Sequence, residues 1–213
     1  MLGGFDTNRL STVFRYYWVS EVTVPNWNVY GVIPPIRPGQ PGHSPDRSPY
    51  KSDLMYFCER FCTSIARYKI LNGFLAYRKE IQNLGIVDGF QWLDGSFLEL
   101  IEASGPRDPG DIDVVTFANP PTGNNLSVSL ASRADLTDFD LAKKTYYVDP
   151  YYMTLGGAFM PWQVQMTSYW YSLWSHRKKD GLWKGFVQIS LDPSEDTNVK
   201  QRLDQVCKSR GLS

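Results

Sequence analysis

FQWLDGSFLELIEASGPRDPGDIDVVTF, residues 90–117, holds two apolar runs separated by turn-forming residues. The first run leads into Gly95 and Ser96, and the second follows an acidic triplet that begins at Asp111 and ends at Asp113. Side chains alternate along a strand, so Asp111 and Asp113 are predicted to project from one face. Adjacent carboxylates repel unless a cation neutralises them, and Mg²⁺ prefers oxygen ligands shared with substrate phosphates. A glycine lets the backbone approach a phosphate closely, so Gly95 and Ser96 are predicted to complete the pocket.

Segments with helical and extended patterns alternate around this stretch, which predicts an α+β domain with a short mixed sheet. Strands are expected at 90–93, at 111–117, in a segment that ends near Asp149, and at 184–191, with one or two more between residues 11 and 33. Helices are expected at 54–65, 70–84, 97–103, 136–143, from Pro161 onward, and at 194–208. Prolines and glycines crowd residues 33–50, which therefore predict an irregular loop.

Composition narrows the class of protein. The chain has 213 residues, 42% of them hydrophobic and 15% aromatic, which is typical of a folded domain with a substantial core. Its formal net charge is zero, which argues against binding nucleic acid along its length, although a local basic patch could still bind an RNA end. No apolar run approaches the roughly 20 residues that span a bilayer, and residues 1–10 lack the pattern of a signal peptide. We therefore expect a cytoplasmic protein without a membrane partner.

Asp149, near the expected end of a later strand, is the third acidic candidate. Three carboxylates on adjacent strands suit nucleotidyl transfer, in which metal ions bridge an oxygen nucleophile and a phosphate. Asp149 is expected to share the metal with Asp111 and Asp113 and to act as the base toward the acceptor hydroxyl. The alternative is that the acidic pair lies on a solvated surface strand and binds no metal ion.

Several basic residues are further candidates for phosphate binding. Lys184, with the run from Arg177 to Lys179, would meet a triphosphate, or these side chains form a solvated turn. Arg60 and Arg67 could face the site from the preceding helices. The aromatic residues between 162 and 174 are expected to belong to the core rather than to a base-stacking platform.

The order of these motifs resembles the nucleotidyltransferase superfamily typified by DNA polymerase beta. The matching positions are Gly95, Ser96, Asp111 and Asp113, with Asp149 as the third carboxylate. Residues 31–190, with GVIPPI, RSPY, GFQWLDGSF, DIDVVTF, VDPYY and WKGFVQI, look like a little-characterised bacterial family of stand-alone nucleotidyltransferase-like proteins of unassigned function. The match divides the chain into an N-terminal extension, 1–30, and a nucleotidyltransferase-like domain, 31–213. The interval from Ser96 to Asp111 is a little longer than the family pattern.

The resemblance implies a polymerase beta-like fold, Mg²⁺ with Mn²⁺ as the alternative, and an NTP whose nucleoside monophosphate is moved to an acceptor hydroxyl. It leaves the acceptor open among a protein side chain, a tRNA 3′ end, a small molecule and a second nucleotide. A partner protein and a toxin-antitoxin or phage-defence setting follow by family association alone. The alternative is a catalytically silent module with the same fold that binds nucleotide or a partner.

Overall fold

A five-stranded mixed sheet organises the protein, in the strand order β1-β5-β2-β3-β4. The computed structural model describes residues 23–212 except 104, 106, 158 and 159. β2 runs antiparallel to both β3 and β5, whereas β3 and β4 run parallel, as do β1 and β5. The strands are β1 Tyr50–Lys51, β2 Gly89–Asp94, β3 Ile112–Ala118, β4 Val148–Thr154 and β5 Val187–Ser190. The expected α+β class with a short mixed sheet is confirmed.

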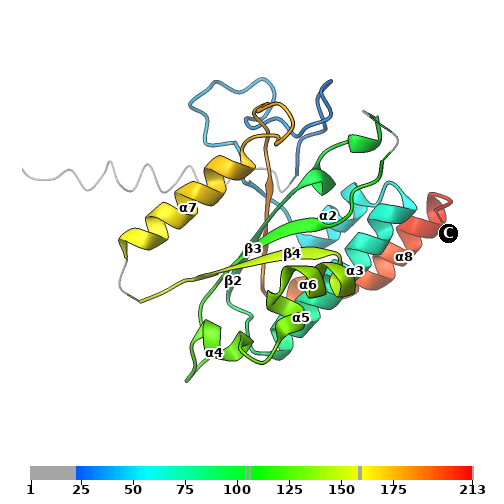
Figure 1. Cartoon of the computed structure of the whole chain (residues 1–213). Coiled ribbons are helices and arrows are strands. Elements are labelled where there is room, and N and C mark those ends of the chain that lie inside the picture. The colour runs from blue at the N-terminus through cyan, green and yellow to red at the C-terminus, as the bar shows by residue number, and fades with distance from the viewer. Residues whose placement is uncertain (1–22, 104, 106, 158–159, 213) are drawn as a thin grey trace, which may run out of the picture.

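Helices cover both faces of this sheet (Figure 1). α2, α3 and α8 lie on one side of the strands, and α7 lies on the other. The helices are α2 Leu54–Phe61, α3 Ile65–Asn83, α4 Leu126–Leu130, α5 Ala134–Thr137, α6 Phe139–Tyr146, α7 Pro161–Trp174 and α8 Val199–Ser209, and three 3₁₀ turns occur at Ser96–Leu98, Ile101–Ala103 and Pro193–Asp196. None of the described helices is long and apolar enough to cross a membrane.

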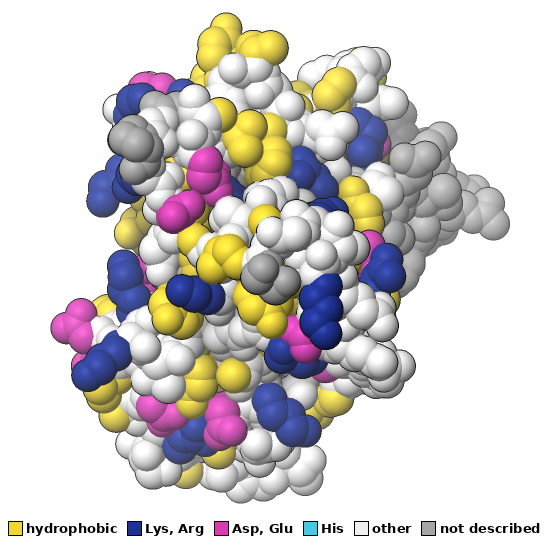
Figure 2. Space-filling model, turned by 90° about the vertical axis from the view of Figure 1, so that its right-hand side faces the viewer, with side chains coloured by type: hydrophobic (Ala, Val, Ile, Leu, Met, Phe, Trp, Pro, Cys, Tyr) yellow, Lys and Arg dark blue, Asp and Glu magenta, His cyan; other side chains and the backbone are white. Residues whose placement is uncertain are grey.

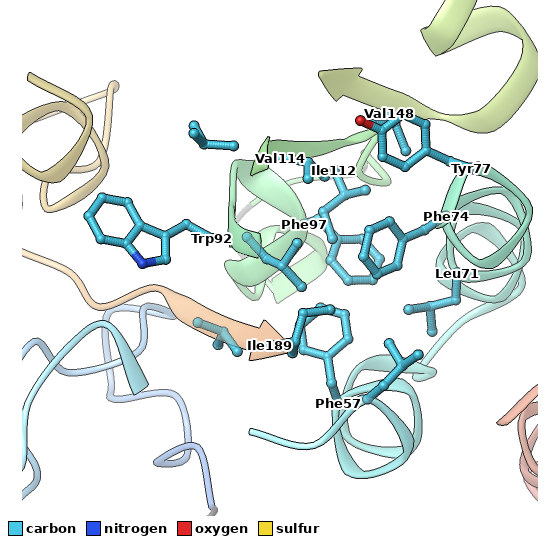
Figure 3. Close-up of a cluster of buried hydrophobic side chains, with 14 of the residues drawn as sticks. Phe57, Leu71, Phe74, Tyr77, Trp92, Phe97, Ile112, Val114, Val148 and Ile189 are labelled. Atoms are coloured by element: carbon cyan, nitrogen blue, oxygen red, sulfur yellow. The ribbon is translucent and has the colours of Figure 1, made fainter. Parts of the chain in front are cut away.

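Aromatic side chains fill the space between the sheet and the α2–α3 layer. Phe57 from α2 and Phe74 from α3 point toward Phe97, which follows β2 (Figure 3). The ring centroids of Phe57 and Phe97 are 6.2 Å apart, and those of Phe57 and Phe74 are 6.3 Å apart. Because these residues bury large apolar areas, the packing fixes the position at which the chain leaves β2.

Arg67, one of two arginines that could face the candidate site from the preceding helices, is buried and supports the chain after β2. Its guanidinium donates to the carbonyl oxygens of Phe97 and Glu99 at 2.5 and 2.6 Å and pairs with Glu102 at 2.5 Å. These hydrogen bonds explain why residues 97–103 do not form the expected helix. Backbone carbonyls that accept from a side chain are diverted from helical bonding, Glu99 is extended, and two 3₁₀ turns result.

The strand that was expected to end near Asp149 begins there. The side chain of Asp138 caps α6 by accepting from the amide of Leu141, and the helix then continues to Tyr146. Tyr147 adopts a left-handed conformation, with φ 56°, and turns the chain into β4. The expected helix at 194–208 likewise divides into a 3₁₀ turn and α8. Of the strands expected between 11 and 33, residues 1–22 lie outside the described chain, and residues 23–33 form no strand.

Candidate functional site

Three aspartates form one row across neighbouring strands. Asp94 at the end of β2 is paired with Asp113 in β3, and Asp113 is paired with Asp149 in β4. Side chains at paired positions of adjacent strands project from the same face of a sheet. Strand register thus gathers three carboxylates at one end of β2, β3 and β4, on the face of the sheet that α7 covers.

Two members of the row, Asp94 and Asp113, line a cleft of about 1060 Å³. The lining also includes the aromatic side chains of Tyr151, Trp170 and Trp174. The rest of the lining is formed by Gly95, Ser96, Glu99, Ile101, Gly105, Arg107, Ser172, Leu173, His176, Arg177, Lys178, Lys179, Gly181 and Lys184. Acidic groups, cations and aromatic side chains therefore line one cleft, as expected of a site for a polar ligand.

Gly95 makes room for the carboxylate of Asp113. Its φ is 84°, a conformation that residues with a Cβ rarely adopt. A Cβ at this position would lie 2.2 Å from Oδ2 of Asp113. The predicted contact with a phosphate is untested, but the structure shows a second need for glycine here, because any side chain would displace Asp113.

The carboxylates of the row are costly to ionise. Burial, and then the charges of Asp94, Asp111 and Asp149, raise the pKa of Asp113 to about 7. Burial also raises the pKa of Asp94 to about 6, against the opposing effect of Lys184, and raises the pKa of Asp149. Groups with pKa values raised in this way favour a bound cation or proton.

Asp149 has one satisfied and one unsatisfied oxygen. The hydroxyl of Tyr151 donates to Oδ2 at 3.2 Å. Oδ1 is buried and forms no hydrogen bond with the described residues; burial raises the pKa of Asp149, and a hydrogen bond from the carboxyl of Asp113 opposes this rise. When Asp113 is ionised, this oxygen is left free to bind a cation or to accept a proton.

Lys184 lies in the wall of the cleft, where carboxylates already offset its charge. Its ammonium is 3.0 Å from Oδ1 of Asp94 and 3.0 Å from Oε1 of Glu99, and the residue is only 3% exposed. Lys184 was predicted to bind nucleotide, and in the structure its ammonium is paired with the carboxylates of Asp94 and Glu99. Lys178 and Lys179, whose side chains are exposed at the cleft, are better placed to meet an anion.

Asp111 lies just outside the row. It precedes β3, and its Oδ2 forms an ion pair with Nζ of Lys143 at 2.8 Å. It is near enough to raise the pKa of Asp113, and, like Asp149, it is not among the residues that line the cleft. Strand register thus pairs Asp113 with Asp149, whereas the carboxylate of Asp111 is paired with Lys143.

Asp94 is the residue that sequence reasoning missed. The available signal was its place directly before Gly95 and Ser96, at the end of an apolar run. Within the described residues, no group of three or more His, Cys, Asp or Glu side chains is arranged to hold a metal ion.

Charges are dispersed on one face of the molecule. Figure 2 shows a face of the molecule on which Lys and Arg side chains are scattered among acidic, apolar and uncharged ones. This distribution agrees with the zero net charge of the chain and gives this face no continuous basic surface.

The fold and the site define the class of this protein: it is an α+β protein with a row of aspartates across the ends of three adjacent strands of a mixed sheet. By its sequence the chain belongs to the Family of unknown function (DUF6932), whose model matches residues 25–190. The match includes all five strands and the whole aspartate row. No curated protein and no solved structure matches the chain.

Proposed function

We propose that this protein is a metal-dependent nucleotidyltransferase with a polymerase beta-like fold, which moves a nucleoside monophosphate from an NTP to an acceptor hydroxyl. The observation that carries the proposal is the register of β3 and β4, which sets Asp149 beside Asp113, a residue in the wall of a cleft that is also lined by cations. The elements that bear the motifs occur in the order of the resemblance, with the Gly95-Ser96 turn between β2 and β3 and Asp149 on the parallel neighbour β4.

The donor set fits Mg²⁺ or Mn²⁺ in chemistry. Asp113 and Asp149 supply carboxylate oxygens, and the pKa values of both groups are raised. Oδ1 of Asp149 is buried and has no hydrogen-bond partner among the described residues. Mg²⁺ is commonly held by one or two carboxylates together with substrate phosphates and waters, so a pair suffices without a third protein ligand. A metal ion bound there would offset the charge that develops on the triphosphate during transfer.

The residues of the chain have separate roles in this proposal. Asp113 and Asp149 hold the metal ion, and Asp149 also accepts the proton of the attacking hydroxyl. Lys178 and Lys179 bind the triphosphate as mobile cations, while Lys184 maintains the wall through Asp94. Trp170 and Trp174, 7% and 5% exposed, limit the access of water from the α7 side.

Pyrophosphate release tests the proposal. The purified chain is incubated with Mg²⁺ and each NTP, labelled at the α-phosphate, in the presence of a protein, a tRNA or a nucleotide as acceptor. Wild type should release pyrophosphate and label an acceptor, Asp113→Asn should do neither, and Asp140→Asn, an exposed change on α6, should match wild type. Binding of Mg²⁺ and NTP without any release of pyrophosphate would instead identify a catalytically silent nucleotide-binding module.

A further inference from the structure

Three residues carry hydroxyl groups into the described part of the cleft: Ser96, Tyr151 and Ser172. Tyr151 is distinguished by its hydrogen bond, in which its hydroxyl donates to Oδ2 of Asp149 at 3.2 Å. Asp149 and Tyr151 are two residues apart in β4, so both side chains project from one face of the strand. A hydroxyl group is therefore already paired with the carboxylate to which we assign the role of base.

The ring of Tyr151 is held in place by aromatic contacts. Its centroid lies 4.3 Å from that of Trp170 in α7 and 5.3 Å from that of Phe139 in α6. These two contacts restrict the rotation of the side chain and keep the hydroxyl near the aspartate row. Such positioning lowers the entropic cost of a reaction at this oxygen.

We propose that Tyr151 is an acceptor in its own right, so that the protein transfers a nucleoside monophosphate from an NTP to the Tyr151 hydroxyl. This inference rests on the proposed function. A bond forms between Oη of Tyr151 and the α-phosphorus, the bond from that phosphorus to the β-phosphate oxygen breaks, and pyrophosphate leaves. The phenolic proton passes to Asp149 along the existing hydrogen bond. No oxidant or further reactant is required.

The location of the product makes the reaction self-limiting. A nucleotide attached to Tyr151 would remain in the cleft beside Asp113 and Asp149 and would obstruct the next NTP. The transfer should therefore stop after each chain has been modified once, which distinguishes it from turnover with an external acceptor.

Site mapping by mass spectrometry tests the inference. The full chain is incubated with Mg²⁺ and each NTP in turn, pyrophosphate is measured, and the protein is analysed by intact mass and by peptide sequencing. We expect the mass of a single nucleoside monophosphate on Tyr151. Tyr151→Phe retains the ring contacts and should lose the label, whereas Ser172→Ala should keep it.

The outcomes separate this inference from the proposed function. Label on another residue, label retained in Tyr151→Phe, or pyrophosphate release from wild type without self-labelling would overturn the role of Tyr151 and leave the transferase standing. Absence of both pyrophosphate and label with every NTP would overturn the role of Tyr151, and the proposed function would fall with it only if pyrophosphate were also absent in the presence of the added acceptors. Mapping in wild type decides the question even if Tyr151→Phe folds poorly, which its melting temperature would reveal.

Discussion

Replacing Asp113 by Asn removes a charge from the middle of the aspartate row and keeps the size of the side chain. The pKa of Asp113 is raised from 3.8 to about 7, by burial first and then by the neighbouring carboxylates. A difference of about 3 pH units, at about 1.4 kcal/mol per unit, means that the ionised group costs the folded state up to about 4 kcal/mol. A buried amide also needs hydrogen-bond partners, so we expect Asp113→Asn to raise the free energy of unfolding by about 1–3 kcal/mol at about pH 8 without divalent cations.

The same reasoning predicts how stability depends on pH. The folded protein holds the proton of Asp113 more tightly than the unfolded chain does, so wild-type stability should fall as the pH rises from about 4 to about 7. Asp94, whose pKa is raised to about 6, acts in the same direction. The variant should lose the part of this slope that belongs to Asp113. Urea unfolding followed by tryptophan fluorescence between about pH 5 and about pH 8 measures both profiles.

A matched surface change and a divalent cation complete the test. Asp140→Asn removes an exposed carboxylate and should leave both the stability and its pH dependence as in wild type. Mg²⁺ with an NTP should stabilise wild type more than Asp113→Asn, because the bound cation needs the carboxylate. Equal or lower stability of Asp113→Asn at about pH 8, or a pH profile parallel to that of wild type, would refute the electrostatic account of the row.

Gly95→Ala should abolish transfer and lower the free energy of unfolding by about 1–3 kcal/mol, because the new Cβ collides with Asp113 and the backbone conformation disfavours a side chain; activity and urea unfolding measure the two effects. Asp149→Asn should transfer nothing and, because it removes one of the two metal ligands, should also weaken the Mg²⁺-dependent binding of NTP in calorimetry; retained turnover would show that the base lies elsewhere. Lys184→Met should lower the free energy of unfolding by about 3–5 kcal/mol, because it leaves Asp94 buried without its cation. The double variant with Asp94→Asn should recover part of that loss in urea unfolding, and no recovery would show that Lys184 acts through other contacts.

Local sequence patterns accounted for much of the fold. The apolar runs on either side of Gly95 and Ser96 predicted strands close to β2 and β3, and helical spacing predicted α2, α3 and α7. These predictions succeeded because periodicity and capping act within a few residues. They failed for residues 97–103, where hydrogen bonds from the distant Arg67 compete with helix formation. They also failed before Asp149, where α6 continues almost to the strand.

The sequence by itself determined that the chain folds as an α+β domain and that an acidic triplet precedes a buried strand beside a Gly-Ser turn. Only the tertiary structure decided which carboxylates meet, because strand register joins residues that lie far apart in the chain. Register placed Asp94 and Asp149 on either side of Asp113, and left Asp111 paired with Lys143. These pairings depend on how helices and sheet pack together, and no local pattern encodes them.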